Sequence, residues 1–167
     1  MAFPEHVKIL RSGLAALMQW QAENPTATLD LENADLRRLE LKDAMLVGAN
    51  LHAAELSEAN LSDSSFMGSD FSKAELFRAK LQRVEMHGVA LVGADLRWAN
   101  LEEADLRSAD LSFANLEHAK LKGANLSGAK LIGAKLCHAD LDDANLYRQL
   151  VRAVLLLDRD LHDARLR

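Results

Sequence analysis

The chain has 167 residues, a formal net charge of −5, 27% charged residues and 49% hydrophobic residues, a composition typical of one folded domain rather than a disordered segment. Its single cysteine, Cys137, excludes an intramolecular disulfide framework and is consistent with a reducing compartment. The first residues lack the basic start and long apolar core of a signal peptide, and no apolar run reaches the ~18 residues of a membrane span. We therefore expect a cytoplasmic protein without a membrane partner.

Residues 4–24 are predicted to form an N-terminal capping helix. Pro4 suits a first helical position, and Pro25 ends the helix. Ile9 and Trp20 fall roughly opposite the main apolar stripe. We expect the stripe to cover the open end of the region that follows, and a partner-binding helix is the alternative. The stripe consists of Val7, Leu10, Leu14, Leu17 and Met18.

A five-residue repeat occupies residues 29–146. Each step reads Ala, then Asp, Asn or Lys, then Leu, then two variable residues, and the Leu position recurs 24 times from Leu31 to Leu146 without a change of phase. In a helix or a straight strand, successive Leu side chains would point to different faces. The chain must instead turn once per repeat, which predicts a solenoid with Leu stacked along its axis. Only Phe66, Phe71 and Met86 replace Leu in this position.

The glycines predict four repeats per coil. Seven glycines occupy the second turn position, and four of the seven are separated by multiples of 20 residues. Turn glycines should gather on one edge, because glycine adopts a positive φ at low cost. Four repeats per coil give six coils, about 29 Å long at ~4.8 Å between stacked strands. The four glycines are Gly48, Gly68, Gly88 and Gly128.

The repeated Ala-(Asp/Asn)-Leu-x-x steps resemble the pentapeptide-repeat family over residues 29–146. The resemblance implies an all-β solenoid, a right-handed quadrilateral β-helix. It also implies that many members have no known activity, while some bind DNA gyrase by imitating DNA. The chain departs from the family pattern in the Ala position at Leu39, Ser64, Ser69, Val84 and Val89.

Residues 147–167 are predicted to form a C-terminal cap, for which we favour a helix over a continued irregular coil. If helical, residues 150–157 are apolar nearly all round, so one face can plug the coil while the rest meets a partner. The resemblance also implies a homodimer, since gyrase-binding members dimerise through their C-terminal ends. The predicted dimerisation residues are Leu150, Val151, Val154, Leu155, Leu156 and Leu157.

The outward residues differ between the four predicted sides. Side one is centred on Leu31, side two on Leu36, side three on Leu41 and side four on Leu46, and each side recurs every 20 residues. Side three carries eight acids and five bases that alternate along the stack, which predicts a charge ladder. Side four is nearly uncharged, and with side one it is a candidate docking surface. Scattered apolar residues on a β-rich surface are the alternative. The candidate partner-binding residues are Met45, Val47, Met67, His87, Val92, Phe113 and Ile132.

A column on side two places Arg78, Trp98, His118 and His138 at steps of 20 residues. We expect Arg78 to make a cation–π contact with Trp98. The histidines, with Cys137 beside them, are zinc-ligand types. The repeat accounts for their spacing, so we expect a solvated surface without a metal. Neither a glycine-rich phosphate loop nor a nucleophile elbow is present, and we expect no cofactor and no catalytic residues.

These observations favour a non-enzymatic solenoid that acts as a protein–protein interaction scaffold, with an unidentified protein partner and no direct binding of nucleic acid. The alternative is a DNA mimic that binds DNA gyrase or another topoisomerase, as an inhibitor or as an antibiotic-protection protein. A mimic needs about one negative charge per 1.7 Å of axis, and side three does not reach this density. A metal- or ligand-binding enzyme is a third reading, which a titratable metal would support.

Overall fold

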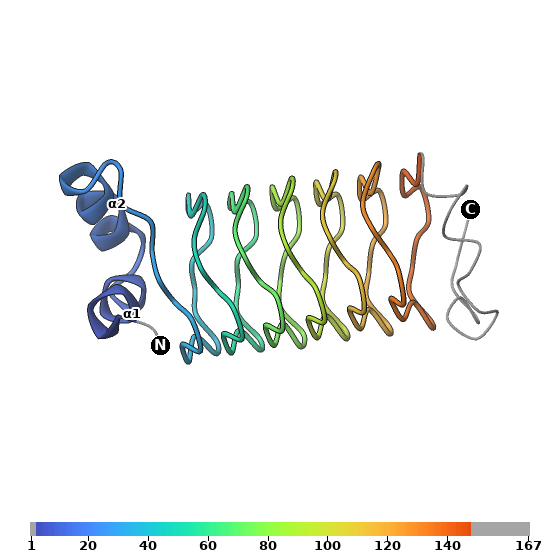
Figure 1. Cartoon of the computed structure of the whole chain (residues 1–167), viewed down its shortest axis with the longest axis horizontal. Coiled ribbons are helices and arrows are strands. Elements are labelled where there is room, and N and C mark those ends of the chain that lie inside the picture. Colours follow the sequence, from blue (N-terminus) through green and yellow to red (C-terminus); the bar gives the residue numbers. More distant parts are fainter. Residues whose placement is uncertain (1–2, 148–167) are drawn as a thin grey trace.

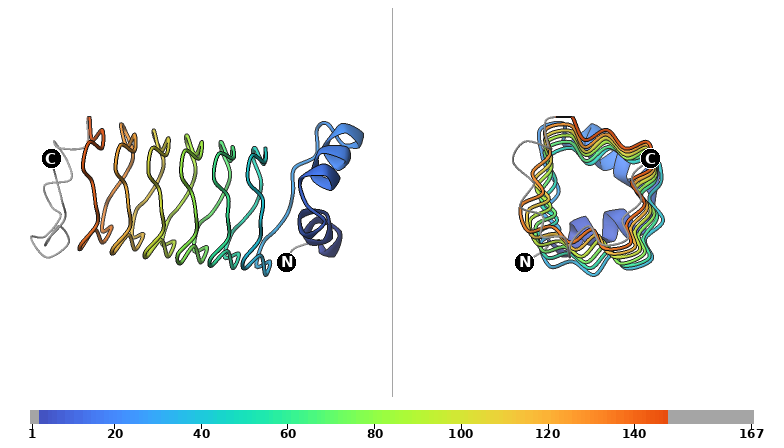
Figure 2. Two further views of the ribbon diagram at one scale, coloured as in Figure 1. Left: turned by 180° about the vertical axis from the view of Figure 1, so that it is seen from behind. Right: turned by 90° about the vertical axis from the view of Figure 1, so that its right-hand side faces the viewer.

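The structure is a computed structural model that describes residues 3–147. Two short helices, α1 (Pro4–Arg11) and α2 (Leu14–Glu23), precede a column of stacked coils and lie at its N-terminal end (Figure 1). Seen along the column, the coils superpose in a four-sided outline (Figure 2). The fold is therefore a solenoid whose first coil is covered by helices.

Parallel β-type pairing joins residues that are 20 positions apart, from Asp30 with Asn50 to Asn125 with Asn145. The Leu31 amide donates a hydrogen bond to the Asn50 carbonyl (2.7 Å), and the Asn50 amide donates to the Leu29 carbonyl (2.9 Å). Four repeats therefore make one coil, as the glycine positions predict. Within residues 3–147, each side contributes one paired residue, and no longer strand forms.

Every corner of the coil is a tight turn. In the first, the Ala34 amide donates to the Leu31 carbonyl (3.0 Å), and Asn33 has φ 58°. A positive φ at this third residue alone is the signature of a type II turn. The same position has a positive φ at each corner from Asn33 to Asp143, and most of these residues are not glycine. The expectation that glycines mark a single edge is therefore wrong, because all four corners need this conformation and Gly93 and Gly123 lie on other sides.

The recurrent Asp and Asn before Leu stabilise these turns. Oδ1 of Asp30 accepts a hydrogen bond from the Glu32 amide (3.2 Å), and Oδ1 of Asn100 accepts one from the Glu102 amide (3.0 Å). In such Asx turns, a side-chain oxygen accepts a hydrogen bond from a backbone amide that has no acceptor in the ladder between coils. The abundance of Asp and Asn in this chain is thus a requirement of the fold.

The core is a filled column. Every residue in the Leu position from Leu31 to Leu141 is at most 4% exposed. The Phe66 and Phe71 rings meet edge to face, 5.1 Å apart, where two Phe residues replace Leu. Nearby, the buried hydroxyl of Ser64 donates to the Leu41 carbonyl (2.9 Å), so its burial leaves no unpaired donor. Buried side chains therefore occupy the axis of the column from Leu31 to Leu141.

The predicted helix over residues 4–24 is two helices, because Gly13 breaks it with φ 92°. Glycine has low helix propensity and adopts this backbone conformation without a Cβ clash. The break lets each helix bury one leucine of the predicted stripe, Leu10 at 1% and Leu17 at 0% exposure. Met18, which was expected on the same stripe, is 60% exposed.

The helices also satisfy the backbone edge of the first coil. The Asp30 carbonyl accepts a hydrogen bond from the Phe3 amide (3.3 Å), and the Asp35 carbonyl accepts one from Arg11 Nη2 (2.8 Å). The Met45 carbonyl accepts one from the Gln21 side chain. An uncovered strand edge is a template for unwanted pairing. Residues 3–23 thus cap both the apolar column and its hydrogen-bonding edge.

Residues 148–167 of the predicted C-terminal cap, which spans residues 147–167, lie outside the described residues, and so do all six predicted dimerisation residues. Among the residues that the structure describes, neither helix has the length and apolar character needed to cross a bilayer.

Candidate interaction surface

Four of the candidate partner-binding residues lie together on side four, over the first three coils. The exposed fractions are 63% for Met45, 49% for Val47 and 40% for Met67, and His87 is also exposed. Val47, Met67 and His87 occupy the same position in successive coils, which are ~4.8 Å apart. We call Met45, Val47, Met67 and His87 the side-four patch.

Side four carries few charges to oppose an apolar partner. In the described residues its only ionisable side chains besides His87 and Tyr147 are Glu85, Asp105 and Arg107. Arg107 donates to both carboxylate oxygens of Asp105, at 2.8 and 2.6 Å, and these hydrogen bonds lower the pKa of Asp105. The charges of Asp105 and Arg107 cancel each other, and Glu85 is the other acid of this side in the described part of the chain.

Two other candidates lie on side one, about three coils farther along the column. Phe113 is 67% exposed and Ile132 is 68% exposed. The Phe113 ring lies over Gly133, since a Cβ at residue 133 would come within 2.7 Å of its Cδ1. We call Phe113 and Ile132 the side-one patch. The last candidate, Val92, is half-buried and belongs to neither patch.

On the other sides, several acids are paired with bases. On side three, Arg83 Nε donates to Asp63 Oδ1 (2.6 Å), and Lys42 Nζ lies 3.5 Å from Asp63 Oδ2. The hydrogen bond from Arg83 holds the pKa of Asp63 below its usual range. The predicted charge ladder thus forms over its first steps.

A second kind of ion pair, which was not predicted, forms within one repeat. In Asp-Leu-Arg steps, the arginine folds back onto the aspartate two residues before it, with Arg37 Nη2 2.8 Å from Asp35 Oδ2. The same fork joins Arg97 to Asp95. The signal was available in the sequence, because Asp and Arg flank an inward Leu and therefore point outward together. These pairs remove negative charge from the surface.

The column on side two is an aromatic stack. The Trp98 and His118 ring centroids are 4.2 Å apart, and those of His118 and His138 are 4.7 Å apart. The predicted contact of Arg78 with Trp98 is wrong: Arg78 lies over Phe77 instead, at 5.1 Å, because that ring is its immediate neighbour. Within residues 3–147, no three His, Cys, Asp or Glu side chains lie together as a metal site would need.

The five-residue steps, the 20-residue register and the inward Leu column agree with a comparison against known families. A sequence profile described as pentapeptide repeats matches eight copies in the chain, over residues 29–52, 44–83, 54–91, 90–128 and 119–148. The chain belongs to the pentapeptide repeat family. The predicted family is confirmed, and membership implies a right-handed β-helix solenoid.

Several solved pentapeptide repeat proteins are similar to this one. Rfr23 from the cyanobacterium Cyanothece 51142 is 28% identical, with a TM-score of 0.45 over 65% of each chain, slightly less than two thirds of its length. A protein of the Arabidopsis thaliana thylakoid lumen is 27% identical, with a TM-score of 0.46 over 65% of this chain and 72% of that one. QnrB1, a plasmid-mediated fluoroquinolone resistance protein, is 20% identical, with a TM-score of 0.41 over 83% and 82%. No curated protein matches the chain.

Proposed function

We propose that this pentapeptide repeat protein is a non-enzymatic scaffold that binds a protein partner through side four. The observation that carries the proposal is the column of Val47 and Met67, both exposed on a side with few charges. Exposed Met and Val become favourable when a partner covers them, because their apolar area leaves water. The side-one patch, with Phe113 and Ile132, offers a second contact for an extended partner.

The backbone makes this surface suitable for binding. Each coil is held to the next by hydrogen bonds, such as those from the Leu46 amide to the Ser65 carbonyl (2.7 Å) and from the Gly48 amide to the Met67 carbonyl (3.0 Å). A surface that is already ordered loses little backbone entropy when it binds. The adjoining corner has glycine at positions 48, 68 and 88, so no side chain projects from it there. We therefore propose a flat, preorganised platform for a partner with an apolar face.

A capture experiment with matched variants tests this proposal. The tagged protein is compared with a Val47→Glu, Met67→Glu variant on side four and with a Lys80→Gln, Lys120→Gln variant on side three. Both double variants make the net charge more negative by two, so only the position of the change differs. We expect a protein that wild type and the side-three variant capture from native lysate and the side-four variant does not. The purified protein must then reproduce this difference by calorimetry. Equal capture by all three proteins contradicts the proposal.

The alternative function is a DNA mimic that binds gyrase, as the family resemblance implies. Its support is the excess of acids, with a net charge of −5 for the chain. Against it stand the pairs that neutralise acids on several sides, among them Asp63 with Arg83, Asp95 with Arg97 and Asp110 with Lys130. A mimic needs continuous negative potential along one face, and alternating signs cancel beyond about 8 Å at physiological salt. We therefore rank it below the scaffold.

A further inference from the structure

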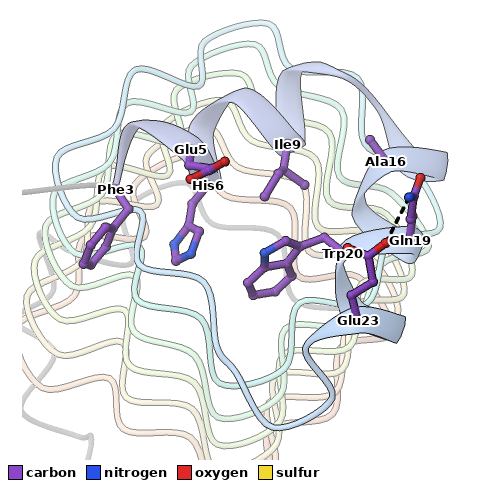
Figure 3. A pocket seen from close by; sticks show the side chains of 8 residues that line it. All are labelled: Phe3, Glu5, His6, Ile9, Ala16, Gln19, Trp20 and Glu23. Carbon is purple, nitrogen blue, oxygen red and sulfur yellow. Dashed lines mark hydrogen bonds between the residues drawn. The ribbon is translucent and has the colours of Figure 1, made fainter.

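A hollow lies at the N-terminal end of the column, between α1 and α2 (Figure 3). Its volume is about 460 Å³, comparable with that of a small-molecule site. Three aromatic side chains and two carboxylates line it. Figure 3 shows the rings of Phe3, His6 and Trp20 in a row, with Glu5 on α1 and Glu23 on α2.

The His6 ring lies between the other two rings, contacts both of them and is anchored to the first coil. The His6 ring lies 5.3 Å from the Phe3 ring and 5.2 Å from the Trp20 ring, centroid to centroid. Nδ1 of His6 is 3.0 Å from the backbone amide nitrogen of Asp30, so this ring is held by a hydrogen bond. The aromatic wall is therefore built into the cap.

The charge of the hollow has one sign. Glu5 and Glu23 are the acids among its lining residues, and no Lys or Arg lines it. Gln19 Nε2 donates a hydrogen bond to Glu23 Oε1 (3.0 Å), which orients that carboxylate. Neither Glu5 nor Glu23 forms an ion pair with a basic side chain of residues 3–147. Both residues are exposed, and their negative charge favours a positively charged ligand in the hollow.

We propose that this hollow binds an organic cation, namely an alkylammonium, quaternary ammonium or guanidinium group. Aromatic faces attract such cations through the ring quadrupole, and Trp is the strongest of the three ring types. The two carboxylates add Coulomb attraction and exclude anionic ligands such as phosphates. The site is at the end of the column and the docking surface is on its sides, so either proposal can fail without the other.

A fluorescence titration tests the site directly. The chain has two tryptophans, so a Trp98→Phe background leaves Trp20 as the single reporter. Phe is tolerated at this turn position, since Phe113 occupies the same position of a repeat on side one with a similar φ. At constant ionic strength, we expect tetramethylammonium chloride to change Trp20 fluorescence saturably. We expect 3,3-dimethyl-1-butanol, an uncharged molecule whose tert-butyl group has the shape of a trimethylammonium group, to bind at least tenfold more weakly.

Two matched variants distinguish the local effect of the Glu5 and Glu23 carboxylates from the effect of net charge. Glu5→Gln with Glu23→Gln should weaken tetramethylammonium binding at least fivefold. Glu102→Gln with Glu103→Gln changes the net charge equally on distant side three, and it should leave binding unchanged. The absence of a saturable change in the Trp98→Phe protein overturns the proposal. Equal binding of the uncharged alcohol also overturns it, as does unaltered binding by the Glu5, Glu23 variant.

The source of the cation is distinguished with two further probes, Nα-acetyl-lysine amide and Nα-acetyl-arginine amide. Tighter binding of either probe than of tetramethylammonium assigns the site to a basic side chain of a partner. Tighter binding of tetramethylammonium assigns it to a small quaternary ammonium compound. Circular dichroism melts of all variants check that the cap remains folded during the comparison.

Discussion

The ring of Phe113 covers Gly133 on the next coil, and it leaves too little space there for a Cβ atom. A Cβ at residue 133 would lie 2.7 Å from Cδ1 and 2.8 Å from Cε1 of the ring. The pairing register places residue i beside residue i+20. Side chains on this surface therefore contact the equivalent residues of the neighbouring coils.

This contact predicts unequal effects of one substitution at two glycines of the same column. Asn tolerates a positive φ, as Asn33 shows, so backbone strain is similar at both sites. Gly133→Asn should lower the free energy of unfolding by about 1 kcal/mol more than Gly93→Asn, because it displaces the Phe113 ring whereas the space at Gly93 is open. Urea unfolding measures both. The difference should vanish in a Phe113→Ala background, and its persistence there would refute the explanation.

Truncation of a single side chain in the axial Leu column should greatly lower the free energy of unfolding. Leu101 is fully buried in the middle of the stack, so Leu101→Ala should lower the free energy of unfolding by about 2–5 kcal/mol. Neighbouring coils are tied by hydrogen bonds and cannot close the cavity. Ile132→Ala removes a comparable side chain that is 68% exposed, and it should change stability by less than about 0.5 kcal/mol. Similar losses for the two variants would exclude an axial Leu101.

The Asp63–Arg83 pair predicts a specific pH dependence. Hydrogen bonding from Arg83 lowers the pKa of Asp63 in the fold, whereas an unfolded aspartate has a pKa of about 3.9. The pair therefore stabilises the fold above that value, and its contribution is lost as pH falls through the lower, folded pKa. Asp63→Asn should lower Tm at pH 7 by no more than about 4 °C. Its Tm should then fall less than that of wild type between pH 5 and pH 3. Arg83→Gln should act in the same way, and parallel wild-type and variant curves would contradict the assignment.

The apolar segment 150–157 predicts a homodimer. It lies outside the described residues, so its role stays a prediction from its sequence. Leu156→Glu with Leu157→Glu should convert a dimer into a monomer, because charged side chains cannot be buried unpaired in an interface. Sedimentation velocity at several concentrations measures this. A wild-type protein that is monomeric at high micromolar concentration rules out the dimer.

Because bases pair with or interrupt the acids on side three, we expect weak or no inhibition of gyrase supercoiling by the purified protein at micromolar concentration. Side three has eight acids interrupted by five bases, and Asp63 is engaged with Arg83. Steering toward a basic DNA-binding saddle needs a continuous field that such alternation does not provide. A supercoiling assay measures inhibition. Potent inhibition that charge reversal at Glu102 and Glu103 weakens would establish the DNA-mimic function instead.

The sequence alone determined the solenoid and its core. A Leu position that keeps its phase from residue 31 to residue 146 has one physical solution, because only a chain that turns at every repeat can bury all these side chains. The exposed candidates followed as well, since Val47 and Met67 flank inward residues and must face outward. In a repeat protein the period converts sequence position directly into spatial position.

Where a side chain has two possible partners, only the tertiary structure shows which one it contacts. Arg78 had two rings within reach and lies over Phe77, and the period could not decide between them. The N-terminal cap lacks the five-residue period. In one straight helix, His6 and Trp20 would be about 21 Å apart, at ~1.5 Å per residue. The break at Gly13 folds α2 back toward α1 and brings the two rings to 5.2 Å. The hollow between the helices therefore exists because a glycine is free to adopt a conformation that its flanking sequence does not require, and packing against the first coil selects that conformation.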